Sequence, residues 1–302
     1  MQSTSQVLMI RPVHFGYNAE TAVNNYFQQK TDGTVQEKAV QEFDELVSKL
    51  RSNNINVNVL EDTIEPHTPD SIFPNNWISF HEDNSITLYP MFAENRRKER
   101  KETVLQFIRD HFNITKINDL SFYEQSGVFL EGTGSMVLDR ENKIVYACLS
   151  PRTNEEVLNH FCKLYKYRKV VFTAADSNGH LIYHTNVMTC IGSRFAVVCL
   201  EAIPEENERK HVIESLTASG KEIISISLQQ LHHFAGNMLE LKNADGENIL
   251  VLSTQAYQSL HQQQIDALEK YATILHSSLN TIETAGGGSA RCMLAEIFNT
   301  PK

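Results

Sequence analysis

Apolar residues recur at every third or fourth position in five separate stretches of the chain. This spacing places one apolar stripe along a helix, where it can be buried against a neighbouring element. The five predicted helices span residues 34–50, 95–112, 154–165, 205–220 and 256–272. Each is followed by a short run that predicts a strand, at residues 55–61, 114–119, 169–175, 221–227 and 279–284. The alternation of helices and short strands indicates the α/β class.

Further strands are predicted in pairs ahead of the helices, such as "SMVLD" with "KIVYACL" and "VMTCIG" with "FAVVCL". A unit of about three strands and one helix thus recurs, with helix centres roughly 50 to 60 residues apart. Five units account for nearly the whole chain without a linker, so we expect one domain over residues 1–302. Five similar units in a closed domain favour a propeller-like ring with a central channel. An open α/β sheet with uneven loops is the alternative.

A conspicuous polar residue lies at the start of each unit, in an apolar or glycine-containing context. These residues are Asn76, Glu131, His184, Asn237 and Cys292, spaced 55, 53, 53 and 55 residues apart. Equivalent positions of a five-fold ring converge on its axis. The ring therefore predicts a central pocket that contains two amides, a carboxylate, an imidazole and a thiol.

Three of these groups form a set that fits nucleophilic catalysis. The thiolate of Cys292 is the nucleophile, His184 activates it and moves protons, and Glu131 fixes the tautomer of the imidazole. Taken singly, each residue has an ordinary structural explanation, but the shared period favours a common site. Three glycines at 286–288 allow the backbone to approach a ligand closely. No role for Asn237 follows from the sequence.

Composition and charge narrow the function classes. The net charge of −10 disfavours nucleic acid and anionic membranes as partners. The five cysteines include no C-x-x-C pair, and the start of the chain does not resemble a signal peptide, so we expect a reducing cytoplasm. The sequence lacks H-E-x-x-H and the G-K-[ST] ending of a phosphate loop, so we expect no metal and no cofactor.

The motifs resemble those of the guanidine-modifying enzymes of the pentein superfamily, and the resemblance covers essentially the whole chain. It implies a five-bladed α/β propeller with the active site in the central channel. "LEGTG" is similar to the superfamily's acid-glycine motif, "YHTN" to its H-x-D motif and "GGGSARCM" to its nucleophile segment. The resemblance thereby implies Glu131 as the acid, His184 as the general acid/base and Cys292 as the nucleophile.

Three further segments carry substrate-binding positions by the same resemblance. "TPDSIFPNNW" implies that Asp70 and Asn76 face the reacting group. "NRRKER" and "LSPRTNEE" imply that Arg96 and Arg152 contact a substrate carboxylate. Asn186 lies at the aspartate position of the H-x-D motif and is implied to contact the same group.

Two departures from the family pattern bear on the substrate. Arginine deiminases hold the guanidinium cation with two aspartates, whereas this chain has Asn76 and Asn186 there. Neutral amides offer donors and acceptors that match a ureido group. The sequence thus resembles the citrulline-hydrolysing branch, which implies hydrolysis of this amino acid to ornithine, ammonia and carbon dioxide. The alternatives are an enzyme acting on arginine, dimethylarginine or another guanidinium substrate, and a non-catalytic binding protein of the same fold. A homo-oligomer is left open.

Overall fold

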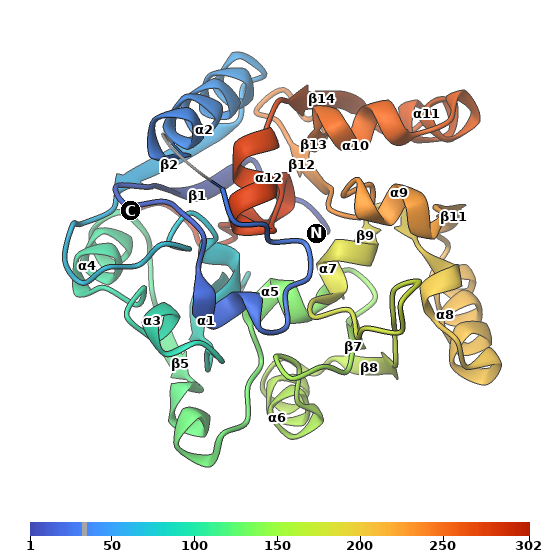
Figure 1. Cartoon of the computed structure of the whole chain (residues 1–302), viewed down its shortest axis with the longest axis horizontal. Helices are drawn as coiled ribbons and strands as arrows, with labels where there is room; N and C mark the ends of the chain where they lie inside the picture. The colour runs from blue at the N-terminus through green and yellow to red at the C-terminus, as the bar shows by residue number, and fades with distance from the viewer. Residues whose placement is uncertain (32–34) are drawn as a thin grey trace.

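Five three-stranded sheets surround a common centre in the computed structural model, which describes residues 1–31 and 35–302 (Figure 1). In each sheet the middle strand pairs antiparallel with one neighbour and parallel with the other. The strands are β15 (Ala295–Glu296), β1 (Gln6–Arg11) and β2 (Asn56–Glu61) in sheet 1; β3 (Ile78–Phe80), β4 (Ser85–Leu88) and β5 (Lys116–Asp119) in sheet 2; β6 (Val137–Asp139), β7 (Ile144–Cys148) and β8 (Arg168–Phe172) in sheet 3; β9 (Thr189–Ile191), β10 (Phe195–Val198) and β11 (Glu222–Ser225) in sheet 4; and β12 (Leu239–Lys242), β13 (Asn248–Ser253) and β14 (Thr273–Ser277) in sheet 5. The predicted five-bladed α/β propeller is confirmed.

Helices join the two parallel strands of every sheet and lie on the outside of the ring (Figure 1). They are α2 (Val35–Ser52), α4 (Glu102–His111), α6 (Glu155–Tyr165), α8 (Glu206–Ala218), and the pair α10 (Thr254–Ser259) and α11 (Gln262–Glu269). Each packs its apolar stripe on its own sheet, as α2 does with Phe43, Leu46 and Leu50. Residue 34, the first residue of the predicted helix 34–50, lies outside the described residues.

The two ends of the chain close the ring. β15, close to the C-terminus, pairs antiparallel with β1, in the register Val7 to Glu296 and Leu8 to Ala295. β1 also pairs in parallel with β2, so sheet 1 combines the first and last strands of the chain. The position of Cys292, three residues before β15 begins, is therefore fixed by this closure.

The strand predicted at residues 279–284 is wrong. These residues lie in α12 (Asn280–Gly286) and the residue before it, and the parallel strand of sheet 5 is β14. Leu279, Ile282 and Ala285 are buried at a spacing of three residues, which suits one face of a helix and not one face of a strand.

Two helices predicted as continuous are interrupted. The segment 95–112 forms α3 (Glu94–Arg97) and α4, because the charged run "NRRKERKE" offers no apolar stripe and Arg96 turns into the protein interior. The segment 256–272 forms α10 and α11, because a capping box of His261 and Gln264 starts a new helix.

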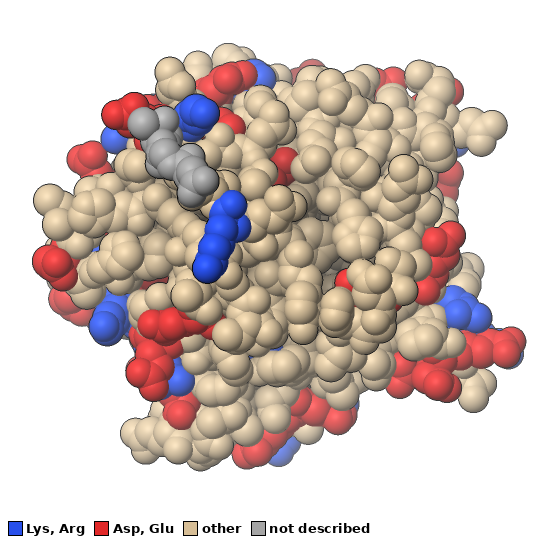
Figure 2. Space-filling view, viewed as in Figure 1, with Lys and Arg blue, Asp and Glu red and all other residues tan. Residues whose placement is uncertain are grey.

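Short helical turns, not outer helices, face the centre of the ring. They are the 3-10 turns η1 (Pro74–Asn76) and η4 (Ala290–Met293) and the helices α5 (Gly132–Ser135) and α7 (Thr185–Met188). The N-terminal segment, with α1 (Ala19–Ala22), crosses over this centre (Figure 1). Most charged side chains visible in Figure 2 lie around the rim of this face, and the surface over the centre is largely uncharged. Within the described ranges, none of the helices has the length and apolar character needed to cross a bilayer.

Candidate active site

The five polar residues of the 53- to 55-residue period occupy equivalent places in the ring. Each lies just before the first strand of a sheet: Asn76 before β3, Glu131 before β6, His184 before β9, Asn237 before β12 and Cys292 before β15. All five are at most 3% exposed. The contacts described below connect Glu131 with His184, Asn237 with Cys292, and both arginines with Glu131, so the convergence expected of a ring is present.

Glu131 and His184 form a buried hydrogen-bonded pair. The Nε2 atom of His184 is 2.8 Å from the Oε2 atom of Glu131, and the other carboxylate oxygen accepts the backbone N–H of Phe92 at 2.9 Å. An ionised carboxylate only accepts hydrogen bonds, so the proton of the imidazole is on Nε2. In the neutral imidazole this leaves Nδ1 as the basic nitrogen.

Two arginines fix the charge state of this pair. Burial opposes ionisation of Glu131, but the Arg152 guanidinium at 3.5 Å, the hydrogen bond with His184 and the Arg96 guanidinium at 3.9 Å outweigh burial. The pKa of Glu131 is therefore lowered, to about 2. Burial lowers the pKa of His184 to about 4, even though Glu131 acts in the opposite direction. A neutral imidazole beside an ionised carboxylate follows at neutral pH.

Gly134 provides the space in which His184 and Asn76 meet. A Cβ atom at this position would lie 2.7 Å from Nδ1 of His184 and 2.5 Å from Nδ2 of Asn76. Gly132 has a left-handed φ of +48°, and a Cβ there would lie 2.4 Å from the carbonyl oxygen of Asn75. Both glycines of "LEGTG" are thus required by close approach of the second and third blades.

The segment that carries Cys292 follows directly after α12. Gly287 ends this helix with a left-handed φ of +63°, and its carbonyl accepts the hydroxyl of Tyr183 at 2.5 Å. The hydroxyl of Ser289 donates to Glu283 at 2.5 Å, and the N–H of Cys292 donates to the carbonyl of Ser289 at 3.0 Å. These contacts fix the turn that presents the sulfur.

The sulfur of Cys292 is surrounded by amides. Its distances are 3.4 Å to Nδ2 of Asn186 and 3.3 Å to Nδ2 of Asn237. Among the described residues, no hydrogen bond joins this sulfur to His184. The oxygen Oδ1 of Asn186 is buried and has no hydrogen-bond partner within the described structure.

The predicted substrate-binding residues of sheet 2 lie beside this group. Asn76 accepts a hydrogen bond from Arg96 at 2.7 Å and lines the cavity next to Cys292, whereas Asn75 accepts from Asn76 and does not line it. Arg96 also binds both carboxylate oxygens of Glu99, at 2.8 and 3.0 Å. Burial raises the pKa of Asp70, against the effect of Arg96.

Glu99 has no part in the sequence-based prediction, although its spacing of three residues from Arg96 is an ordinary sign of a helical ion pair. Burial raises the pKa of Glu99 to about 7, and Arg96 opposes this rise. Both Asp70 and Glu99 are therefore shifted toward their uncharged forms.

The N-terminal segment covers the site and binds several of its residues. Arg152 donates to Oδ1 of Asn24 at 2.7 Å and to the carbonyl of Thr21 at 2.6 Å. Asp70 accepts from Nδ2 of Asn18 at 2.8 Å and from the hydroxyl of Thr21 at 3.1 Å. Nothing in the periodicity of the sequence indicates these contacts.

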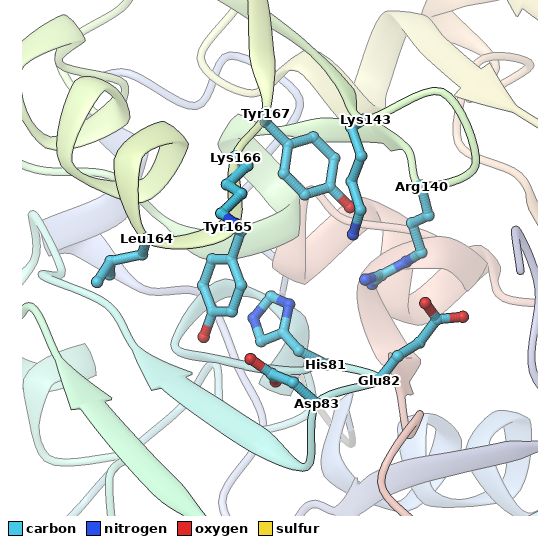
Figure 3. Close-up of a pocket in the computed structure, with 9 residues that line it drawn as sticks. All are labelled: His81, Glu82, Asp83, Arg140, Lys143, Leu164, Tyr165, Lys166 and Tyr167. Carbon is cyan, nitrogen blue, oxygen red and sulfur yellow. The ribbon is translucent and has the colours of Figure 1, made fainter.

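The cavity beside Cys292 is too small for an amino acid in this conformation. Its volume is about 10 Å³, room for one water molecule at most. A larger cavity of about 390 Å³ lies between the turn at 81–83 and residues 164–167 at the C-terminal end of α6, with Arg140 and Lys143 at its side (Figure 3). It shares no lining residue with the cavity at Cys292. In the described part of the chain, no three His, Cys, Asp or Glu residues are grouped to hold a metal ion.

Solved structures with the same fold include ArgZ, an arginine dihydrolase from cyanobacteria, with a TM-score of 0.76 at 16% identity. The match covers 97% of this chain and 40% of ArgZ, so the chain spans less than half the length of that protein. The substrate-bound N-terminal domain of ArgZ is matched over 97% of both chains, with a TM-score of 0.76 at 16% identity. A dimethylarginine dimethylaminohydrolase variant, as an adduct with S-methyl-L-thiocitrulline, has a TM-score of 0.66 at 13% identity over 98% of this chain and 100% of its own.

No curated protein shows significant sequence similarity to the chain. A family model described as eukaryotic N,N dimethylarginine dimethylhydrolase matches residues 11–299. The chain therefore belongs to this family of the guanidine-modifying pentein superfamily.

Proposed function

We propose that the protein hydrolyses citrulline to ornithine, ammonia and carbon dioxide through a covalent intermediate on Cys292. The observation that carries the proposal is the neutrality of the groups around the sulfur, where Asn186 and Asn237 present amides at 3.4 and 3.3 Å. A cationic guanidinium in a buried site requires compensating carboxylates, whereas a ureido group requires only donors and acceptors.

The charges deeper in the site support the same conclusion. Glu131 lies within 4 Å of both Arg152 and Arg96, and Glu99 is bound by Arg96 through two hydrogen bonds. The buried carboxylates are thus matched by guanidinium groups of the protein itself. A citrulline side chain adds no charge to this cluster.

In the proposed mechanism, the Cys292 thiolate attacks the ureido carbon and forms the C–S bond. His184 first takes up, on Nδ1, the proton that Cys292 gives up, and then delivers it to the leaving nitrogen as the C–N bond breaks. The same residue then takes a proton from water, which attacks the S-carbonyl intermediate and releases the thiolate and a carbamic acid. The remaining C–N bond breaks as this carbamic acid decomposes to carbon dioxide and the second amine. Glu131 orients His184 and stabilises its cation during these transfers. One water molecule is consumed for each citrulline.

Two of the groups that we assign to the amino acid, Arg152 and Asp70, now bind the N-terminal segment. Arg96 and Arg152 would take the α-carboxylate, and Asn76, Asn186 and Asp70 the ureido group. Arg152 donates to one oxygen atom of Asn24 and one of Thr21, and a carboxylate would supply two such acceptors. Because the cavity holds about 10 Å³, we infer that this segment moves aside when the amino acid enters.

A guanidinium substrate is the second candidate. The Oδ1 atom of Asp70 is buried without a hydrogen-bond partner among the described residues, and an ionised Asp70 would face a cation favourably. The family match and the arginine dihydrolase ArgZ point in the same direction. The shift of the Asp70 pKa toward the uncharged acid favours citrulline instead.

We further propose that residues 1–302 form one catalytic domain that works in the cytoplasm.

Parallel turnover of citrulline, arginine and dimethylarginine by the purified protein tests the proposal. We expect ornithine and ammonia in equal amounts from citrulline, and at least tenfold lower kcat/KM for both guanidinium compounds. Faster consumption of arginine or dimethylarginine contradicts the assignment of substrate. Citrulline turnover that survives Cys292→Ala contradicts the covalent mechanism.

A further inference from the structure

We propose that Asn237 is a positioning residue that holds the sulfur of Cys292 as a thiolate by donating an amide hydrogen to it. The residue is fully buried and lies just before β12, at the only ring position to which the sequence assigns no role. The inference rests on the proposed function only in taking Cys292 as the nucleophile.

The hydrogen bonds of Asn237 fix which end of its amide faces the sulfur. Oδ1 accepts the backbone N–H of Arg291 at 3.0 Å, and Nδ2 donates to the backbone carbonyl of Asn186 at 2.9 Å. A carbonyl only accepts and an N–H only donates, so the amide cannot be turned over without losing both bonds. The second hydrogen of Nδ2 is therefore left for Cys292, whose sulfur is 3.3 Å away.

This contact favours one protonation state of the sulfur. A thiol is a weak acceptor, whereas a thiolate is a strong one, and hydrogen bonds to charged groups are about twice as strong as neutral ones. In the thiol form, the S–H would have to reach Oδ1 of Asn237 at 3.8 Å, a longer contact. Asn186 supplies a second donor to the same sulfur at 3.4 Å.

The amides, and not the charged or titratable groups around the sulfur, are the groups that can stabilise a thiolate by hydrogen bonds. Those that line its cavity are Asp70 and Arg96 from sheet 2, Arg152 from sheet 3, and Tyr183 and His184 ahead of sheet 4. None of them is hydrogen-bonded to the sulfur in the described structure, and the imidazole is neutral. A cysteine–imidazolium pair, the usual way to stabilise a thiolate, is thus replaced by two N–H donors.

Gly236 brings the donor into place. A Cβ atom at this position would lie 2.4 Å from the carbonyl oxygen of Val187 and 2.6 Å from the carbonyl carbon of Met188. The backbone that carries Asn237 therefore packs directly on α7, which carries Asn186. The two amides and the nucleophile segment form one hydrogen-bonded unit across three blades.

The test measures the sulfur directly, by the rate of iodoacetamide alkylation of Cys292 as a function of pH. We expect Asn237→Ala to raise the pH midpoint of alkylation by about one unit, which is a tenfold change in the ionisation equilibrium. A more basic thiolate is about threefold more nucleophilic, with a Brønsted coefficient of 0.4–0.5. The net rate at neutral pH should thus fall about threefold, and the deficit should vanish and then reverse at high pH.

Two variants serve as controls. Cys292→Ala gives the background from the other four cysteines. Asn299→Ala removes an equally buried asparagine, whose Nδ2 donates to the carbonyls of Ser85 and Asn113, so its alkylation profile should match the wild type. Asn237→Asp should shift the midpoint further than Asn237→Ala, because a carboxylate repels the thiolate.

An unchanged midpoint in folded Asn237→Ala overturns the inference, even where turnover falls, since that combination shows a merely structural role. A midpoint that shifts while the wild type fails to consume citrulline upholds the inference and rejects the proposed substrate. The two failures are therefore distinguishable.

Discussion

Replacing Gly134 by alanine inserts one methyl group between His184 and Asn76. The new Cβ would lie 2.7 Å from Nδ1 of His184, whereas ordinary contact begins at 3.4 Å, so the ring must move by about 0.7 Å (3.4 − 2.7). Glu131 holds the opposite nitrogen at 2.8 Å, and the ring cannot move this far without disturbing that hydrogen bond.

A displacement of about 1 Å in a catalytic group costs on the order of a hundredfold in rate. We therefore expect Gly134→Ala to lower kcat/KM roughly 10- to 100-fold, or about 1.4 to 2.8 kcal/mol of transition-state stabilisation. The free energy of unfolding should fall by at most about 3 kcal/mol, because one extra methyl group in a packed interior usually costs about 1–3 kcal/mol. Gly134 does not have a left-handed φ, so alanine adds no backbone strain.

Ornithine release measures the activity of this variant, and urea unfolding measures its stability. Gly16→Ala is the matched control, because Gly16 has no left-handed φ and a Cβ there meets no described atom within 4 Å. We expect the control to retain wild-type kcat/KM. Full activity in folded Gly134→Ala would refute the reasoning, because it would show that the position of His184 does not limit the reaction.

Three further predictions concern charge. Asn186→Asp places a carboxylate beside the Cys292 sulfur, so citrulline turnover should fall at least tenfold and the ratio of arginine to citrulline turnover should rise. Arg152→Lys keeps the charge but loses the two-pronged contact, so KM for the amino acid should rise about tenfold with a smaller change in kcat. Burial lowers the pKa of His184 to about 4, so the unfolded chain, with an ordinary value near 6.5, takes up this proton first as the pH falls. The stability that the neutral imidazole contributes is complete above pH 6.5 and is lost toward pH 4. The free energy of unfolding of the wild type should therefore fall by about 2 kcal/mol relative to that of His184→Gln between pH 7.5 and 4.5. An unchanged difference between the two proteins in urea unfolding contradicts the buried neutral imidazole.

The amphipathic outer helices could be predicted because each has a complete apolar stripe. Predictions for α2, α6 and α8 differ from the structure by at most two residues at either end. The errors in the predicted elements occur where an apolar stripe is short or runs into the apolar residues of the next element. In sheet 5, the two apolar residues of β14 follow directly on the pattern of α11, and Leu279 and Ile282 then restart an apolar run that belongs to α12. Periodicity alone does not separate such short runs.

The central residues could be predicted because a ring turns a sequence period into a common location. The residues that join them from the N-terminal segment could not, since Asn18, Asn24 and Asn25 meet partners up to 262 residues away. Those contacts depend on the path of a segment with no regular pattern. Glu99 is different in kind, because its pairing with Arg96 is local and follows from helical spacing.

The charged groups of the site and the amides that contact the sulfur come from different blades. Sheets 2 and 3 supply the charged groups Glu131, Arg96 and Arg152, and the amides of Asn186 and Asn237 contact the sulfur from α7 and sheet 5. A reacting carbon at Cys292 would thus lie between neutral donors and a carboxylate–imidazole pair. A guanidinium placed there must give up its hydration, at a cost of several kcal/mol per buried ion unless a free carboxylate faces it. A ureido group loses far less, so the preference for citrulline would follow from the same amides that hold the thiolate.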